Sequence, residues 1–216
     1  MGIISRFPAG ATKPYIEETY NSDGQLIDAK MYGHETIRAY AFYYCPSLAS
    51  TTLPSGITSI GDAAFYYCSS LALTTLPSGI TSLGANAFES CSSLALTSLP
   101  SGITNISAGA FAACTNLALT TLPSGITNIG NSAFAVCTNL ALTTLPSGIT
   151  NIDDYAFVEC SSLVSLTFEG TPENIGARAF AGCNNLTTIN VPWAEGAVAN
   201  APRGAENATI NYGYTG

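Results

Sequence analysis

Apolar and polar positions along the middle of the chain follow one pattern that repeats with a fixed period. The unit Ile-x-x-x-Ala-Phe-x-x-Cys-x-x-Leu occurs seven times and recurs every 23 residues, with Leu83 once in place of the isoleucine. The phenylalanine stands at Phe42, Phe65, Phe88, Phe111, Phe134, Phe157 and Phe180. The cysteine stands at Cys45, Cys68, Cys91, Cys114, Cys137, Cys160 and Cys183. A fixed period in this range is typical of a solenoid, in which each repeat buries its apolar face against its neighbours.

The link between two units predicts the path of one coil. Residues 72–76 have the composition of a short strand, and residues 77–79, Pro-Ser-Gly, have that of a turn. Because proline lacks an N–H, it ends the hydrogen-bonded ladder there. A second extended segment is expected over residues 80–83, followed by a helical turn over residues 87–91. We therefore predict an α/β solenoid of seven repeats, each with a short parallel strand and a short helical turn.

The segments before the repeats predict an N-terminal cap. Residues 1–14, which contain several prolines and glycines, are expected to form a flexible or attaching arm. Residues 15–36 hold two β-prone runs around an Asp-Gly turn, so they predict a β-hairpin that covers the first coil. The solenoid itself is expected over residues 37–192, with a second cap over residues 193–216.

The repeat pattern weakens near the C-terminal end. Residues 168–175, Phe-Glu-Gly-Thr-Pro-Glu-Asn-Ile, replace the usual link, and the last repeat recovers with Cys183 and Leu186. Residues 193–200 suggest a short helix, and residues 208–212 suggest a terminal strand. We expect Trp193 to lie as a lid over the last coil.

Charged residues are scarce, and acidic ones dominate. Asp, Glu, Lys and Arg make up 9% of the chain, the formal net charge is −8, and no Lys or Arg lies between Arg38 and Arg178. Because nucleic acids and anionic membrane surfaces attract basic clusters, neither is an expected partner. No apolar run reaches the roughly 20 residues of a membrane span, so membrane insertion is not expected. The N-terminal apolar run is too short for a signal peptide, so we expect that a leader has been removed or that none is needed.

The full unit, Ile-Thr-x-Ile-Gly-x-x-Ala-Phe-x-x-Cys-x-x-Leu followed by Leu-Pro-x-Gly-Ile, resembles the BspA-like leucine-rich repeat, also called the treponemal type. The resemblance implies a leucine-rich-repeat solenoid, a role in cell-surface adhesion and protein binding, and no cofactor. The flanking segments, residues 15–24 and 201–212, also resemble those of such proteins in gut Firmicutes and their prophages.

Four repeats depart from the family pattern in the strand. The family places strand hydrophobics three and five residues after the last leucine of the unit, as Leu166 and Phe168 do here. In repeats two to five the third position is threonine, and a leucine stands one residue earlier. These leucines are Leu73, Leu96, Leu119 and Leu142. Since alternate strand residues face opposite sides, either the strand shifts locally and buries them, or they form an exposed apolar stripe that marks a contact site.

The residues that carry chemistry elsewhere do not form a catalytic constellation here. Zinc needs four clustered ligands, but each coil offers one thiol, so we expect a ladder of buried free thiols rather than a metal site or disulfides. His34 is the single histidine, with no partner suggested for nucleophilic catalysis. Asp153, Asp154 and Glu159 are the densest acidic group, and we interpret them as a solvated patch. Neither an enzyme nor a metal protein is predicted.

Most variation between repeats lies at the positions that flank the Phe and the Cys. Helical spacing directs these positions away from the core. In the first two repeats they hold Tyr40, Tyr43, Tyr44, Tyr66 and Tyr67. Tyrosine supplies a large amphipathic contact area at low entropic cost. We hypothesise that this edge, or the leucine and threonine face of the sheet, binds a protein or a glycan; the alternative is that the tyrosines only shield the first coils.

The sequence therefore predicts a non-enzymatic binding or adhesion module, extracellular or at the cell surface, without a cofactor. Its expected partner is a protein or glycan on a host or bacterial surface. The alternative is a phage or prophage virion component, such as a tail protein, that recognises a host surface. The sequence specifies neither the ligand nor the oligomeric state.

Overall fold

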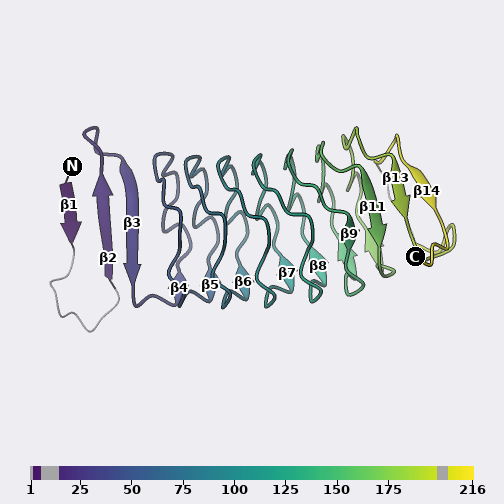
Figure 1. Ribbon diagram of the computed structural model, residues 1–216, viewed down its shortest axis with the longest axis horizontal. Helices are drawn as coiled ribbons and strands as arrows, with labels where there is room; N and C mark the ends of the chain where they lie inside the picture. The colour runs from purple at the N-terminus through teal and green to yellow at the C-terminus, as the bar shows by residue number, and fades with distance from the viewer. Residues whose placement is uncertain (1, 6–14, 199–203) are drawn as a thin grey trace.

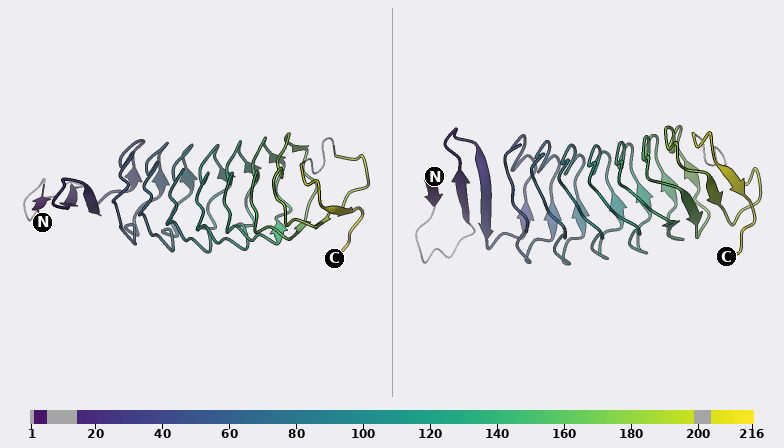
Figure 2. Two further views of the ribbon diagram at one scale, coloured as in Figure 1. Left: turned by 90° about the horizontal axis from the view of Figure 1, so that it is seen from above. Right: turned by 45° about the horizontal axis from the view of Figure 1, so that its top comes forward.

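The computed structural model describes residues 2–5, 15–198 and 204–216. The chain winds into an elongated solenoid, with a small antiparallel sheet at its N-terminal end and the C-terminal segment at the other (Figure 1). Two further views show that the coils stack along one axis (Figure 2). The solenoid, the hairpin, the 23-residue coil and the extended segment near residues 80–83 are thus as predicted, while the strand over residues 72–76 and the helical turn are not.

The N-terminal sheet contains three strands in the order β1-β2-β3. Their bounds are Gly2–Ser5 for β1, Tyr15–Tyr20 for β2 and Leu26–Tyr32 for β3. The predicted hairpin corresponds to β2 and β3, which pair antiparallel around the Asp-Gly turn. Ala29 and Met31 of β3 belong to the hydrophobic core. The hairpin therefore covers the first coil, as a cap must.

One row of parallel strands runs the length of the solenoid. Its strands are β4 (Thr36–Ile37), β5 (Ser59–Ile60), β6 (Ser82–Leu83), β7 (Asn105–Ile106), β8 (Asn128–Ile129), β10 (Asn151–Ile152) and β12 (Asn174–Ile175). Strands β4 to β6 form one sheet, and β7, β8, β10 and β12 form another. Equivalent residues pair across neighbouring coils, as Ile129 does with Ile152. The isoleucine faces the core and the polar residue before it faces outward, because strand side chains alternate.

The second row of parallel strands is confined to the C-terminal half. It comprises β9 (Thr144–Leu145), β11 (Ser165–Phe168), β13 (Thr188–Asn190) and β14 (Thr209–Asn211). The strand predicted over residues 72–76 is wrong, because this segment buries Leu73 and Leu76 on either side of two exposed threonines. Two successive outward residues interrupt the strict alternation that a strand requires. The chain passes through an irregular bend there instead.

The four leucines that depart from the strand pattern of the family are buried. Leu73, Leu96, Leu119 and Leu142 are each exposed by 0–1%. A local shift of the chain therefore turns them into the core, and the hypothesis of an exposed leucine stripe is wrong. The outward positions beside them belong to the threonines Thr74, Thr97, Thr120 and Thr143.

The predicted helical turn is also wrong: no helix occurs in the described part of the chain. The Ala-Phe-x-x-Cys segment forms consecutive turns in which the N–H of Ala41 donates to the carbonyl of Arg38 (3.2 Å) and that of Phe42 donates to Ala64 on the next coil (2.8 Å). Alternate N–H groups thus bond within the coil and between coils, which removes the i to i−4 pattern of a helix. The predicted helix over residues 193–200 is absent from its described part, residues 193–198.

In each coil, the turns around the Ala-Phe-x-x-Cys segment place two residues, four positions apart, in a left-handed backbone conformation. They are Tyr40, Tyr44, Ala63, Tyr67, Asn86, Ser90, Gly109, Ala113, Ser132, Val136, Tyr155, Glu159, Arg178 and Gly182. Twelve of the fourteen are not glycine, although a left-handed conformation costs an L-residue roughly 1–2 kcal/mol. The hydrogen bonds between coils therefore impose this backbone against local preference.

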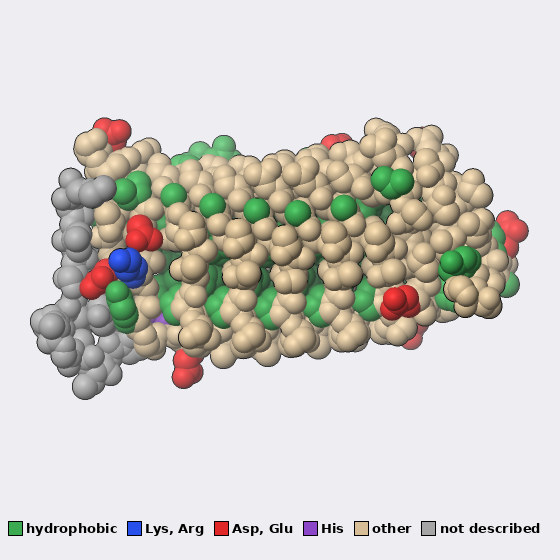
Figure 3. Space-filling view, in the orientation of Figure 1, with side chains coloured by type: hydrophobic (Ala, Val, Ile, Leu, Met, Phe, Trp, Pro, Cys, Tyr) green, Lys and Arg blue, Asp and Glu red, His purple; other side chains and the backbone are tan. Residues whose placement is uncertain are grey.

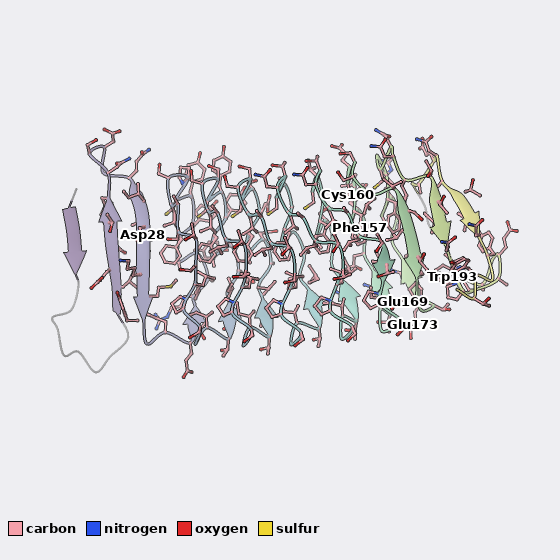
Figure 4. The ribbon with its side chains drawn as sticks, in the orientation of Figure 1. Asp28, Phe157, Cys160, Glu169, Glu173 and Trp193 are labelled. Atoms are coloured by element: carbon pink, nitrogen blue, oxygen red, sulfur yellow. The ribbon has the colours of Figure 1, made fainter. Side chains whose placement is uncertain are left out.

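Phenylalanine and cysteine form two parallel ladders in the core. Neighbouring Phe rings stack with centroids 5.2–5.7 Å apart and planes within 11°. Each cysteine from the second coil onward donates its S–H to the Phe carbonyl of the coil before, as Cys160 does to Phe134 at 3.1 Å. Phe157 and Cys160 belong to one such coil (Figure 4). All seven cysteines are free thiols, in agreement with the predicted thiol ladder.

The C-terminal segment extends the solenoid by part of another coil. Strand β14 pairs in parallel with β13, confirming the predicted terminal strand. Asn207 donates its side-chain amide to the carbonyl of Asn184, 23 residues earlier, at 3.3 Å. Trp193 is 5% exposed and packs edge to face against Phe168, with ring centroids 5.1 Å apart. This end is thus closed by continuation of the coil and by a buried indole.

Candidate binding surface

Five tyrosines from the first two coils gather on one edge of the solenoid, and we call this group the tyrosine surface. It consists of Tyr40, Tyr43, Tyr44, Tyr66 and Tyr67. Four of them are 41–64% exposed, and Tyr66 is half-buried. The structure therefore brings together all the aromatic residues that the sequence predicted for this site.

The rings of the tyrosine surface stack between the two coils. Tyr43 lies against Tyr66 with centroids 4.9 Å apart, and Tyr44 lies against Tyr67 at 4.7 Å. Tyr40 meets Tyr43 edge to face at 5.7 Å. Because stacked rings cover each other's inner faces, each pair presents its ring edges and its two outer faces. Aromatic edges carry partial positive charge, so this surface suits electron-rich groups of a partner.

The backbone of the turns holds these side chains in register. The N–H of Tyr44 donates to the carbonyl of Tyr66 at 2.8 Å, which fixes the distance between the coils. Phe42 points into the core, and the two residues that follow it point outward. The left-handed backbone at Tyr44 and Tyr67 has φ of 57° at both positions, so the two rings leave the chain in parallel directions.

Glu89 bounds the tyrosine surface on the third coil, at the position equivalent to Tyr43 and Tyr66. Burial raises the pKa of the Glu89 carboxyl. The negative charge of Glu89 in turn raises the pKa of Tyr66, with partial burial as a further cause. Farther along the same row the equivalent residues are small and apolar: Ala112, Ala135, Val158 and Ala181. The aromatic surface is therefore confined to the N-terminal end.

The face shown in Figure 3 has few charged side chains between the two ends of the solenoid. Acidic groups that do occur in the coils take part in local bonds. Asp153 accepts a bond from the side-chain amide of Asn151 at 2.7 Å, and Asp154 accepts the N–H of Ala177 at 2.6 Å. Of the acidic group singled out in the sequence, Asp154 thus joins two neighbouring coils.

The other candidate residues do not assemble into a reactive site. His34 lies apart in the cap, half-buried, and its Nε2 has no hydrogen-bond partner. Within the described residues, no three His, Cys, Asp or Glu side chains lie close enough to hold a metal ion. Burial raises the pKa of Cys68 and of Cys137 to about 12, which disfavours the thiolate that a nucleophile needs.

Sequence reasoning missed an asparagine ladder on the outer side of the first strand row. The amide of Asn128 donates to Asn105 at 2.6 Å, and that of Asn151 donates to Asn128 at the same distance. Asn174 continues the series to Asn151 at 2.8 Å. The repeated Asn-Ile dipeptide, spaced 23 residues apart, is the signal that could have revealed it.

Sequence reasoning also missed two clefts where the hairpin meets the first coil. The larger, of about 430 Å³, lies between β3 and residues 50–54. Asp28 lines it and accepts a hydrogen bond from Ser50 at 2.7 Å (Figure 4). The smaller, of about 370 Å³, lies between the hairpin turn and the residues after Tyr44. Both arise because the hairpin and the coil touch at only part of their length, which no local pattern predicts.

These features define the class of protein. Parallel strands, a 23-residue coil and a leucine-rich core make this a leucine-rich-repeat solenoid. The model of the BspA type leucine-rich repeat region matches residues 35–164 and 97–195, in six copies. The chain therefore belongs to the BspA-type leucine-rich repeat family, which confirms the resemblance. A comparison with curated protein sequences gives no match.

Solved structures share the fold. A leucine-rich cell surface protein from Faecalibacterium prausnitzii is 25% identical, with a TM-score of 0.65, over 87% of this chain and 54% of that one. The leucine-rich repeat protein of T. pallidum is 30% identical, with a TM-score of 0.61, over 78% of this chain and 86% of that one. The chain thus spans about half the length of the first protein. Among the described residues, no helix is long and apolar enough to cross a membrane.

Proposed function

We propose that this protein is a non-enzymatic binding module that attaches to a protein or glycan on a host or bacterial surface through the tyrosine surface. The observation that carries the proposal is the clustering of five tyrosines on the first two coils, whereas the equivalent positions of the later coils hold a single tyrosine, Tyr155. Tyrosine is enriched at recognition sites because its ring gives contact area while losing little conformational entropy.

The fold and the composition of the surface support the same function. The fold is that of bacterial leucine-rich repeat proteins, one of which is described as a cell surface protein. An extracellular or cell-surface location fits a surface whose polarity comes from Ser, Thr and Asn, with only 9% charged residues. The scarcity of Lys and Arg favours a partner that is bound by aromatic and polar contacts rather than by charge neutralisation.

The test compares equivalent tyrosines on different coils. Tyr40 and Tyr155 occupy the same position in their repeats, are both exposed, and have φ of 59° and 58°. We expect Tyr40→Ala combined with Tyr43→Ala to weaken binding to immobilised bacterial or host-cell surface extracts at least tenfold, since hot-spot truncations cost about 2 kcal/mol or more. Tyr155→Ala should leave binding unchanged.

Circular dichroism spectra would confirm that each variant keeps the fold. Equal binding by the wild type and the Tyr40/Tyr43 variant would contradict a role for the tyrosine surface. Loss of binding in the Tyr155→Ala variant would instead indicate that the contact site lies elsewhere on the solenoid.

A further inference from the structure

The smaller cleft at the junction of cap and solenoid has the composition of a ligand site. Its volume of about 370 Å³ falls within the range of small-molecule sites. Apolar contact comes from Leu26 and Pro46, an aromatic wall from Tyr44, and polar groups from Gln25 and Ser47. None of its lining residues carries a charged side chain. A ligand of this cleft must therefore be neutral, small and partly apolar.

The hairpin turn fixes the orientation of the Gln25 side chain. Asn21 Oδ1 accepts the backbone N–H groups of Asp23 (3.0 Å) and Gln25 (2.9 Å), so its Nδ2 must point the other way. That Nδ2 donates to Gln25 Oε1 at 2.8 Å, and Ser47 Oγ donates to the same oxygen at 3.1 Å. Gln25 Oε1 therefore has both its lone pairs engaged, and turning the amide would lose the bond from Asn21, whose Nδ2 cannot accept.

This arrangement leaves a donor and an acceptor available in the cleft. No hydrogen bond to a described residue engages the Nε2 of Gln25, which carries two N–H donors. Ser47 uses its proton toward Gln25, so its oxygen keeps lone pairs that can accept a bond. Groups held in place before binding lose less entropy when a ligand arrives. The cleft thus offers one fixed donor beside one fixed acceptor.

Tyr44 contributes a ring face rather than a ring edge. One face of Tyr44 is covered by Tyr67 on the next coil, 4.7 Å away. Its other face is directed toward the N-terminal end, where the hairpin turn and Tyr44 line the same cleft. The face of an aromatic ring carries partial negative charge and attracts polarised C–H groups. Tyr44 therefore supplies the aromatic wall of the cleft.

We propose that this cleft binds one neutral pyranose residue of a glycan. A pyranose has an apolar side of C–H groups that fits the free face of Tyr44. Its hydroxyls both donate and accept hydrogen bonds, which matches the amide of Gln25 and the hydroxyl of Ser47. This inference rests on the proposed binding function and names the ligand class of one part of it. The tyrosine surface outside the cleft binds independently of the sugar.

The experiment is a titration of the full chain, labelled with ¹⁵N, with methyl glycosides of glucose, galactose, mannose, fucose, N-acetylglucosamine and N-acetylgalactosamine. The hairpin residues are not repeated in the sequence, so their amide signals are distinct from those of the coils. We expect at least one sugar to shift the amide signals of residues 24–26, 44, 45 and 47 with a dissociation constant on the order of 1 mM.

Two variants separate the proposed contacts from the fold. Gln25→Glu keeps the oxygens that Asn21 and Ser47 bond but removes the N–H donors, so it should weaken sugar binding about tenfold. Tyr44→Leu removes the aromatic face and should make binding too weak to measure. Tyr155→Leu replaces an exposed tyrosine of the sixth coil, outside both the cleft and the tyrosine surface, and should leave the sugar affinity unchanged.

The proposal is overturned if no neutral glycoside gives saturable shifts at these residues at about 50 mM, well above the expected constant. It is also overturned if Gln25→Glu and Tyr44→Leu bind the sugar like the wild type. In those cases, adhesion that still depends on Tyr40 and Tyr43 would leave the proposed function intact. Sugar binding without such adhesion would contradict the proposed function alone.

Discussion

The buried thiol ladder predicts that the protein unfolds in mildly alkaline solution. Six cysteines, from the second coil onward, are at most 4% exposed. Burial raises the pKa of Cys183 to about 11 and that of Cys68 to about 12, from an ordinary value of 9.0. Burial also raises the pKa values of Cys91, Cys114 and Cys160 well above that value. Ionising any of these thiols would place a charge in an apolar core.

The sign and size of the effect follow from proton linkage. Because the folded-state pKa values are raised, the contribution of the thiols to stability is complete below pH 9 and is lost as the pH rises toward 11 or 12. At pH 10, one unit above the unfolded value, each thiol lowers the free energy of unfolding by about 1.4 kcal/mol. Six thiols together lower it by about 8 kcal/mol, which is comparable to the whole stability of a typical domain, about 5–15 kcal/mol.

Urea denaturation followed by circular dichroism, in the presence of a reductant, measures this loss between pH 8 and pH 10. We expect the free energy of unfolding to fall by about 4 kcal/mol per pH unit near pH 9, where half of the unfolded thiols are ionised. Replacing Cys114 and Cys137 together by alanine should reduce that slope by about one third, whatever its effect on stability at pH 7. A stability that stays constant from pH 8 to pH 10 would refute the reasoning, and equal slopes in both proteins would assign the alkaline loss to other groups.

Three substitutions test other parts of the fold by urea denaturation at neutral pH. Phe111→Leu should destabilise the protein by about 1–3 kcal/mol, because it removes two stacked ring contacts; no measurable loss would contradict a contribution from stacking. Val136→Gly should raise the stability by about 1 kcal/mol, because the branched residue has φ of 60°, and a decrease would show that its packing outweighs the backbone strain. Asn128→Ala should cost about 1–2 kcal/mol by breaking two amide bonds, whereas Asn139→Ala, which is exposed and outside the ladder, should cost almost nothing.

The sequence predicted the positions in the core better than the conformation of the backbone. The isoleucine, phenylalanine, cysteine and leucine positions of each unit are buried as expected, except at the half-buried Cys45 of the first coil, because a fixed period leaves each coil one set of neighbours to pack against. The spacing of Ala-Phe-x-x-Cys fits a helical turn and a pair of β-turns equally well. The deciding bond, from Phe42 to Ala64, joins residues of different coils, so a local pattern could not reveal it.

At the candidate site, too, the sequence predicted which positions are exposed but not how their side chains are arranged. Outward positions next to Phe42 and Phe65 were identified from the variation between repeats, and their tyrosines are indeed at the surface. That Tyr44 stacks on Tyr67 and turns its other face to the hairpin depends on the coil spacing and on where the cap sits. The leucines at positions such as Leu73 were ambiguous, because two burial patterns fit the same residues until the backbone bend was known.

The joint between the hairpin and the first coil sets how the molecule responds to force. The hydrogen bonds across it include those of Ala49 to Ile27, Ser47 to Gln25 and Ser50 to Asp28. Every interior coil is tied to the next by bonds along its turns and its strands, with ring stacks and thiol bonds in addition. A pull along the axis therefore opens the N-terminal joint before any coil separates. Under the proposed binding function, the binding surface and the weakest joint of the molecule would lie at the same end of the solenoid.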